Sequence, residues 1–149
     1  MNIHVVRPDG SWYSRPDITL VRDADRFCLP DDCTSALACR GLCIRIGKAG
    51  KAVEPRFARR YPDGWASAVL FYGVTADGTP TPLLDRATRV DRDFHSFDTL
   101  DAAWQESALQ ALVRISLHLS LRIGDFMILE CDGPVPLGRG CVFENIDIL

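Results

Sequence analysis

The sequence lacks the features that mark membrane, secreted and nucleotide-binding proteins. No apolar run approaches the roughly 20 residues that a membrane-spanning helix needs, and residues 1–6 carry neither a basic segment nor a long apolar core. We therefore expect no signal peptide, no membrane partner and a cytoplasmic location. The patterns G-x-x-x-x-G-K-[ST], G-x-G-x-x-G and G-x-S-x-G are also missing. Their absence removes the common motifs for nucleotide binding and for a serine nucleophile.

An excess of positive charge is missing as well. The chain has 17 Lys and Arg against 20 Asp and Glu, which gives a formal net charge of −3. This balance argues against a nucleic-acid partner, because such binding depends on neutralising phosphates. The local basic cluster of Arg56, Arg59 and Arg60 is explained by the solvated face of a short helix.

The six cysteines lack the spacing of a metal or disulfide framework. No C-x-x-C pair occurs, and no histidine stands near a cysteine at zinc-finger spacing. Cys39 and Cys43 lie on one face of a predicted strand, about 13 Å apart at the usual rise per residue. That distance is too long for one disulfide. We interpret the cysteines as buried thiols of a reducing compartment.

A length of 149 residues indicates a single domain over 1–149. Alternating apolar residues predict long strands at 35–46 and 65–75, and an apolar stripe predicts a helix at 98–119 that Asp98 or Thr99 caps. Shorter elements are predicted as strands at 3–6, 26–29, 121–130 and 141–149, an extended edge at 12–20, a helix at 55–61, a polar turn at 22–25, and loops at 79–96 and 133–140. About seven strands and two short helices give a mainly β (α+β) fold.

Residues 42–61, LCIRIGKAGKAVEPRFARRY, read as a strand, a Gly-Lys turn and a basic helix that begins at Pro55. This segment resembles the fumarylacetoacetate hydrolase family, in which a strand of the pattern E-x-E-L-x-V-R-I precedes a G-K turn and an R-F-A-x-R-Y-like helix start. Residues 15–30, 119–126 (LSLRIGDF) and 133–138 are similar to further family segments in the same order. The resemblance implies a mixed β-roll or sandwich and a homodimer.

The resemblance also implies a divalent metal that two strand glutamates and a third carboxylate hold. The matching positions here are Cys39, Gly41 and Leu70. A thiol, a hydrogen and an isobutyl group cannot replace three carboxylates around Mg²⁺ or Mn²⁺, which need oxygen ligands. The early histidine of the family has no counterpart, and its middle segment is shortened between Gly73 and Asp98. We therefore expect no metal cofactor and a degenerate, non-catalytic member of the family.

A remnant pocket is the candidate site, and its expected residues are Cys39, Arg40, Gly41, Leu70, Glu130 and Asp132. The Arg40 guanidinium could replace the metal's charge and hold a carboxylate, although strand alternation directs it away from Cys39. Glu130 and Asp132 are predicted to end a strand in solvent, beside Gly133. The pocket could take a small-molecule carboxylate, or the protein could serve as an interaction subunit.

Two other interpretations stay open. An active metal-dependent hydrolase, isomerase or decarboxylase of 2-oxo acids could draw its ligands from unaligned positions such as Glu130 and Asp132. The strand at 66–74, with the face that holds Trp65, Phe71 and Tyr72, is a candidate for the dimer contact, and core packing explains it equally well.

Overall fold

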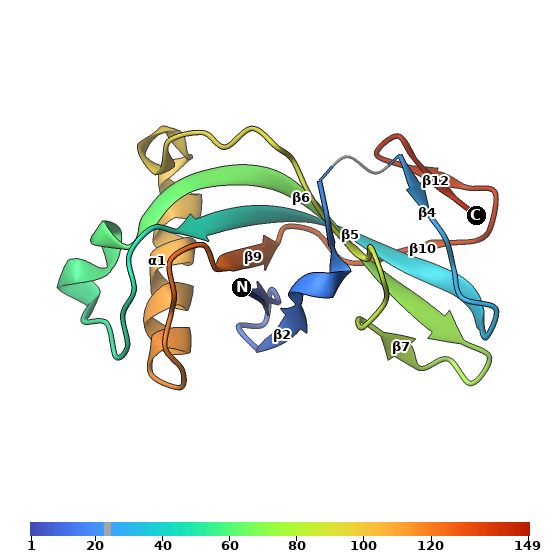
Figure 1. Cartoon of the computed structure of the whole chain (residues 1–149), viewed down its shortest axis with the longest axis horizontal. Coiled ribbons are helices and arrows are strands. Elements are labelled where there is room, and N and C mark those ends of the chain that lie inside the picture. Colours follow the sequence, from blue (N-terminus) through green and yellow to red (C-terminus); the bar gives the residue numbers. More distant parts are fainter. Residues whose placement is uncertain (23–24) are drawn as a thin grey trace.

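The computed structural model describes residues 1–22 and 25–149, so the predicted turn at 22–25 lies partly outside the described residues. The predicted mainly β fold is confirmed (Figure 1). The main sheet has nine strands: β1 Asn2–Val6, β2 Trp12–Pro16, β3 Leu20–Val21, β5 Cys33–Ile46, β6 Pro62–Thr75, β7 Pro80–Thr81, β8 Thr88–Val90, β9 Phe126–Glu130 and β10 Val135–Leu137. A smaller sheet contains β4 Arg26–Phe27, β11 Val142–Phe143 and β12 Ile146–Ile148.

The two long strands β5 and β6 form the centre of the molecule. Their regular alternation lets them pair antiparallel almost from end to end, with Cys39 opposite Leu70. On its other side β5 pairs with β9, where Gly41 lies opposite Glu130. Strand β1 then pairs parallel with β9, and β2 forms one edge of the sheet.

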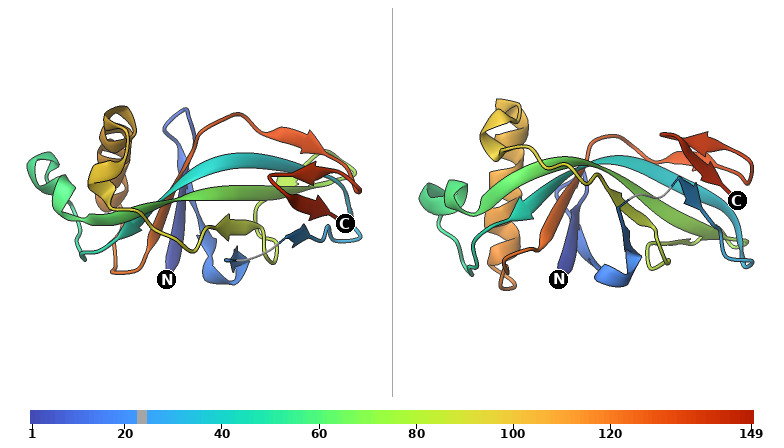
Figure 2. Two further views of the ribbon diagram at one scale, coloured as in Figure 1. Left: turned by 90° about the horizontal axis from the view of Figure 1, so that it is seen from above. Right: turned by 45° about the horizontal axis from the view of Figure 1, so that its top comes forward.

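The main sheet curls until its two edges come close together. Strand β2 is one edge and β3 is the other, and only the short 3-10 helix η1, Asp17–Thr19, separates them in the chain. The Arg15 side chain on β2 donates to the backbone oxygens of Phe71 on β6 and of Ala87 beside β8. Figures 1 and 2 show the resulting curved sheet. We call the enclosed surface the inner face; it carries Cys39, Cys43, Leu70, Phe126 and Ile128, all buried.

The opposite, outer face has a cover at each end. At one end helix α1, Ala102–Ser116, packs Leu112 and Ile115 against Ile44 of β5. At the other end the small sheet packs Phe27 flat on Phe71, with ring centroids 4.4 Å apart. Figure 2 shows the helix and the small sheet apart from each other, over opposite ends of the long strands. The strip of outer face between the two covers is the region of interest below.

Several predicted elements need correction. Residues 79–96 are not all loop, because β7 and β8 extend the sheet there, and 133–140 contains β10. Residues 141–149 form a hairpin instead of one strand, since Glu144 and Asn145 take left-handed φ angles of 49° and 62° that turn the chain. The strand predicted at 121–130 begins only at Phe126.

The predicted helices also differ in detail. The carboxylate of Asp101, rather than Asp98 or Thr99, caps α1 by accepting from the backbone N–H of Ala103 at 2.9 Å. Residues Phe97–Thr99 form the 3-10 helix η3, and the basic helix η2, Pro55–Arg60, is also of the 3-10 type. Among the helices of residues 1–22 and 25–149, none has the length and apolar character required to cross a membrane.

Candidate functional site

The structure brings together the three positions that match the family's metal ligands. Cys39 and Leu70 are direct neighbours across β5 and β6, and Gly41 lies two residues further along the inner face of β5. Cys39 is 1% exposed and Leu70 is fully buried. The backbone arrangement that a three-ligand site on this face would need is therefore present.

The side chains at these positions fill the space with apolar atoms. A Cβ atom added to Gly41 would lie 2.7 Å from Cγ2 of Ile128 and 3.6 Å from Cβ of Ala68. A hard cation such as Mg²⁺ or Mn²⁺ requires about six oxygen ligands, and a thiol, a glycine and a leucine offer no side-chain oxygen. In the described part of the chain, no group of three or more His, Cys, Asp or Glu residues is arranged to hold a metal ion. The residues present do not fit the family's metal.

The buried thiols on the inner face are poor nucleophiles. Burial raises the pKa of Cys39 to about 11, and the nearby Glu130 carboxylate adds to the effect. Burial also raises the pKa of Cys43 far above its ordinary value. Because the thiolate is the reactive form, neither thiol is prepared for attack near neutral pH. The His95 ring lies against the ring of Trp65, with centroids 4.6 Å apart.

Glu130 corrects a prediction, because it does not end its strand in solvent. Its side chain is only 9% exposed, and the Tyr72 hydroxyl donates a hydrogen bond of 2.7 Å to Oε1. The Tyr72 and Tyr13 hydroxyl oxygens are 2.6 Å apart, and Nε of Arg15 donates to Tyr13 at 3.0 Å. The partner on β6 is 58 residues away in sequence, which is why local sequence pattern could not indicate the burial.

The hydrogen bonds from Arg15 to Glu130 run in one direction. An arginine can only donate, so Tyr13 accepts from it and donates to Tyr72, and Tyr72 donates to Glu130. These hydrogen bonds join the buried Arg15 guanidinium to the Glu130 carboxyl group through two phenols, and each bond polarises the next.

Arg40 and Asp132 lie outside this inner network. Arg40 projects from the outer face, 60% exposed, and pairs with Glu144 and, at 3.4 Å, with Asp132. The predicted orientation of Arg40 away from Cys39 is confirmed. The six residues of the predicted remnant pocket therefore divide into an inner set, Cys39, Gly41, Leu70 and Glu130, and an outer set, Arg40 and Asp132. Because Glu130 and Asp132 have different partners, they do not form a shared cation site.

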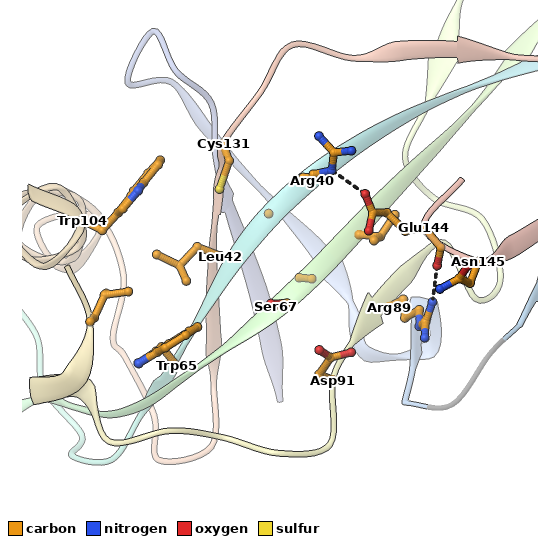
Figure 3. A pocket seen from close by; sticks show the side chains of 14 residues that line it. Arg40, Leu42, Trp65, Ser67, Arg89, Asp91, Trp104, Cys131, Glu144 and Asn145 are labelled. Atoms are coloured by element: carbon orange, nitrogen blue, oxygen red, sulfur yellow. Dashed lines mark hydrogen bonds and ion pairs between the residues drawn. The ribbon is translucent and has the colours of Figure 1, made fainter. Parts of the chain in front are cut away.

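A cavity of about 570 Å³ lies on the outer face, in the strip between α1 and the small sheet. Figure 3 shows Trp65 of β6 and Trp104 of α1 toward one end, with Arg40 of β5 and Arg89 of β8 toward the other. The turn at Glu144 also lines the cavity. We call it the Trp–Arg groove. It lies on the opposite side of the sheet from Cys39.

Each end of the groove presents a distinct chemistry. The indole N–H of Trp65 donates to the Thr99 hydroxyl at 3.0 Å, and the ring also rests against His95, so this aromatic wall is held in place. At the other end Arg89 donates from one terminal nitrogen to the Glu144 backbone oxygen at 3.3 Å. Its Nε is buried and has no hydrogen-bond partner among the described residues. Arg89 likewise forms no ion pair with a described residue, unlike Arg40.

Sequence reasoning missed most of this groove. From the sequence, Trp65 is a candidate for a dimer contact or for core packing, and no local pattern marks Trp104 or Arg89, because the groove residues come from separate elements. Phe71 and Tyr72, the other predicted contact residues, are 1% and 7% exposed and belong to the core of this chain. Whether the chain forms a homodimer stays a prediction.

The fold matches proteins of known structure, whereas no protein-family model matches the sequence and no curated protein matches it. Fumarylpyruvate hydrolase from Pseudomonas aeruginosa, in complex with Mn²⁺ and pyruvate, aligns with a TM-score of 0.71 at 14% identity, over 94% of this chain and 82% of that one. Maleylpyruvate hydrolase from Sphingobium sp. SYK-6 gives 0.79 at 15% identity, over 99% and 70% of the two chains.

A third match is a protein from Yersinia pestis CO92 described as a fumarylacetoacetate hydrolase family member. It gives a TM-score of 0.76 at 13% identity, over 93% of this chain and 84% of that one. The chain therefore has the fold of the fumarylacetoacetate hydrolase family. At these identities the similarity establishes the fold, and the chemistry must be argued from the residues of this chain.

Proposed function

We propose that this protein is a non-catalytic binding protein with the fumarylacetoacetate hydrolase fold, and that it takes a small organic carboxylate with an apolar body in the Trp–Arg groove. The observation that carries the proposal is the buried Nε of Arg89, which has no acceptor among the described residues. A buried donor left without a partner costs about 1–3 kcal/mol. A carboxylate in the groove would pair with the terminal nitrogens of the Arg89 guanidinium, and a rotation of the side chain would bring Nε to the same acceptor.

The groove has the size and the wall chemistry for such a ligand. Its volume of about 570 Å³ is within the usual range for small-molecule pockets. A planar guanidinium matches a carboxylate through two parallel hydrogen bonds, and Arg89 has donors left for this. The indole rings of Trp65 and Trp104 offer an apolar surface for the rest of the ligand.

The inner face supports the non-catalytic part of the proposal. The neighbour from Pseudomonas aeruginosa is in complex with Mn²⁺ and pyruvate, and in this chain the corresponding side chains offer no oxygen to a metal. We therefore derive no step through a metal. A carboxylate ligand would instead meet a guanidinium, on the other side of the sheet.

The proposal is tested by titrating the protein with 3-phenylpropionate while recording amide chemical shifts. We expect saturable shifts at Trp65, Ser67 and Arg89, and an affinity that EDTA and Mn²⁺ leave unchanged. Arg89→Gln should weaken binding about 10-fold or more, the usual effect of losing one charge-assisted contact. Arg89→Lys should weaken it as well, because an ammonium lacks the planar fork. The matched control is Arg56→Gln, which removes an exposed arginine on η2 outside the groove.

Two results would contradict the proposal. If Arg89→Gln and Arg56→Gln bind 3-phenylpropionate equally well, the groove is not the carboxylate site. If the protein hydrolyses an acylpyruvate in the presence of Mn²⁺, with multiple turnovers that a chelator abolishes, it is an enzyme of the alternative, metal-dependent class.

A further inference from the structure

We propose a second ligand site, independent of the Trp–Arg groove, that takes a small organic ammonium ion. The site is a cavity of about 390 Å³ at the end of β9 on the inner side of the sheet. Its floor is the carboxylate of Glu130 beside Tyr72, and its remaining walls include Leu37, Cys39 and Pro134. We call it the Glu130 cavity.

The floor of the Glu130 cavity carries a carboxyl group that forms no ion pair with a described residue. The hydrogen bonds from Arg15 through Tyr13 and Tyr72 end at this group. They use only Oε1 of the carboxylate. Within the described residues, no donor contacts the other oxygen. A carboxyl group with one hydrogen bond has acceptor sites left for a donor that enters the cavity.

The apolar walls cannot supply such a donor. Pro8, Pro80 and Pro134 line the cavity, and proline has no backbone N–H. Leu37 has no polar side-chain atom, and the Cys39 thiol is a weak donor. A ligand that enters this cavity therefore meets these apolar walls, Arg7 and Asp9 at the rim, and the Glu130 carboxyl group.

The two nearby arginines are engaged elsewhere. Arg15 uses its guanidinium on Tyr13, on Thr88 and on two backbone oxygens, all within the protein. Arg7, at the rim, stacks its guanidinium on the Tyr13 ring, 4.4 Å from the ring centre. Asp9 on the same turn offsets the charge of Arg7 at the rim. The position beside the free oxygen of Glu130 is thus open to a cation from solution.

An ammonium group on a compact apolar body satisfies these conditions. Its N–H groups would donate to the free carboxylate oxygen, and its hydrocarbon part would displace water from the leucine and proline walls. The volume suits a molecule of about the size of benzylammonium. A carboxylate ligand would instead be repelled by Glu130, which separates this site from the Trp–Arg groove.

The test uses three probes of one shape: benzylammonium, neutral benzyl alcohol and anionic benzoate. We expect benzylammonium to shift the amide signals of Leu37 and Cys39 saturably, and to bind at least 10-fold more tightly than either other probe. Glu130→Gln should weaken benzylammonium binding about 10- to 100-fold, as expected for loss of a charged partner. Asp132→Asn is the matched control, since it removes a neighbouring exposed carboxylate that pairs with Arg40, and it should change the affinity less than twofold.

Equal binding of benzyl alcohol and benzylammonium would overturn the proposal, as would an unchanged affinity in Glu130→Gln. Should Glu130→Gln fail to fold, Leu37→Trp tests the same cavity by filling it while Glu130 and Tyr72 stay in place; benzylammonium binding must then be lost. The two proposals can be refuted separately, because each has its own variant. Arg89→Gln should leave benzylammonium binding intact, and Glu130→Gln should leave 3-phenylpropionate binding intact.

Discussion

Replacing Gly41 with alanine tests how tightly the inner face is packed at an inherited ligand position. The added methyl carbon would lie 2.7 Å from Cγ2 of Ile128, whereas two carbon atoms at optimal separation are about 3.5–4.0 Å apart. The added carbon and Cγ2 of Ile128 must therefore move apart by roughly 1 Å. Ile128 cannot easily yield, because it is fully buried on β9, which β1 and β5 flank on both sides.

The expected loss of stability follows from two opposing terms. Overpacking a filled core costs about 1–3 kcal/mol. Replacing a strand glycine with alanine restores roughly 0.5–1 kcal/mol of backbone stability. We therefore expect Gly41→Ala to lower the free energy of unfolding by about 1–2 kcal/mol. Urea denaturation followed by circular dichroism measures this as a lower midpoint with an unchanged slope.

Two further variants make the measurement specific. Gly133 has open space where a Cβ would stand, so Gly133→Ala should be neutral or stabilise the fold by up to about 1 kcal/mol. Ile128→Leu removes the branch at Cβ, and in the double variant it should recover part of the loss from Gly41→Ala as a coupling of about 0.5 kcal/mol or more. Gly41→Ala that is as stable as the wild type would show that this position is open and refute the packing argument.

Three other properties can be measured on the same protein. Burial lowers the pKa of His4 below 6.5, and Asp125 only partly opposes this shift. Because the unfolded chain then takes up the proton first, the free energy of unfolding should fall as the pH drops from 7 through 6.5, by at most about 1.4 kcal/mol per pH unit. His4→Gln should make this pH dependence less steep. The exposed thiols of Cys28 and Cys141 should react quickly with DTNB at pH 8 while Cys39, with a pKa of about 11, reacts only after unfolding; fast modification of Cys39 in the native protein would contradict its burial. Light scattering after size exclusion should give twice the chain mass of 16.6 kDa if the homodimer that the family resemblance implies exists, and a single chain mass would exclude it.

The sequence predicted the long elements and the division of the sheet into two faces. Strands β5 and β6 were recognisable because apolar residues alternate along them, and the same alternation correctly directed Arg40 away from Cys39. The segments β7, β8 and β10 were missed because two or three residues cannot show a period. Their strand structure comes from pairing with the two long strands: β10 pairs with β5, and β7 and β8 pair with β6.

The polar features of the site depend on contacts between distant segments. Glu130 stands next to a Gly-Pro loop, which suggests exposure, and only the fold brings Tyr72 to it. The turn at Glu144 lacks the glycine that usually marks a tight hairpin, so neither the hairpin nor its place beside Arg89 was predictable. Trp104 lies on a helix that reaches the groove from a separate element.

The most direct test of whether the three family ligand positions on the inner face can hold a metal is a Mn²⁺ titration that follows paramagnetic broadening of backbone amide signals, with pyruvate or oxalate present. We predict no saturable broadening at Cys39, Gly41 or Leu70 and no calorimetric heat of binding. Saturable broadening centred on these three residues, with heat that requires the carboxylate, would show that a metal binds on this face and would contradict the conclusion that the side chains at these positions do not fit the family's metal.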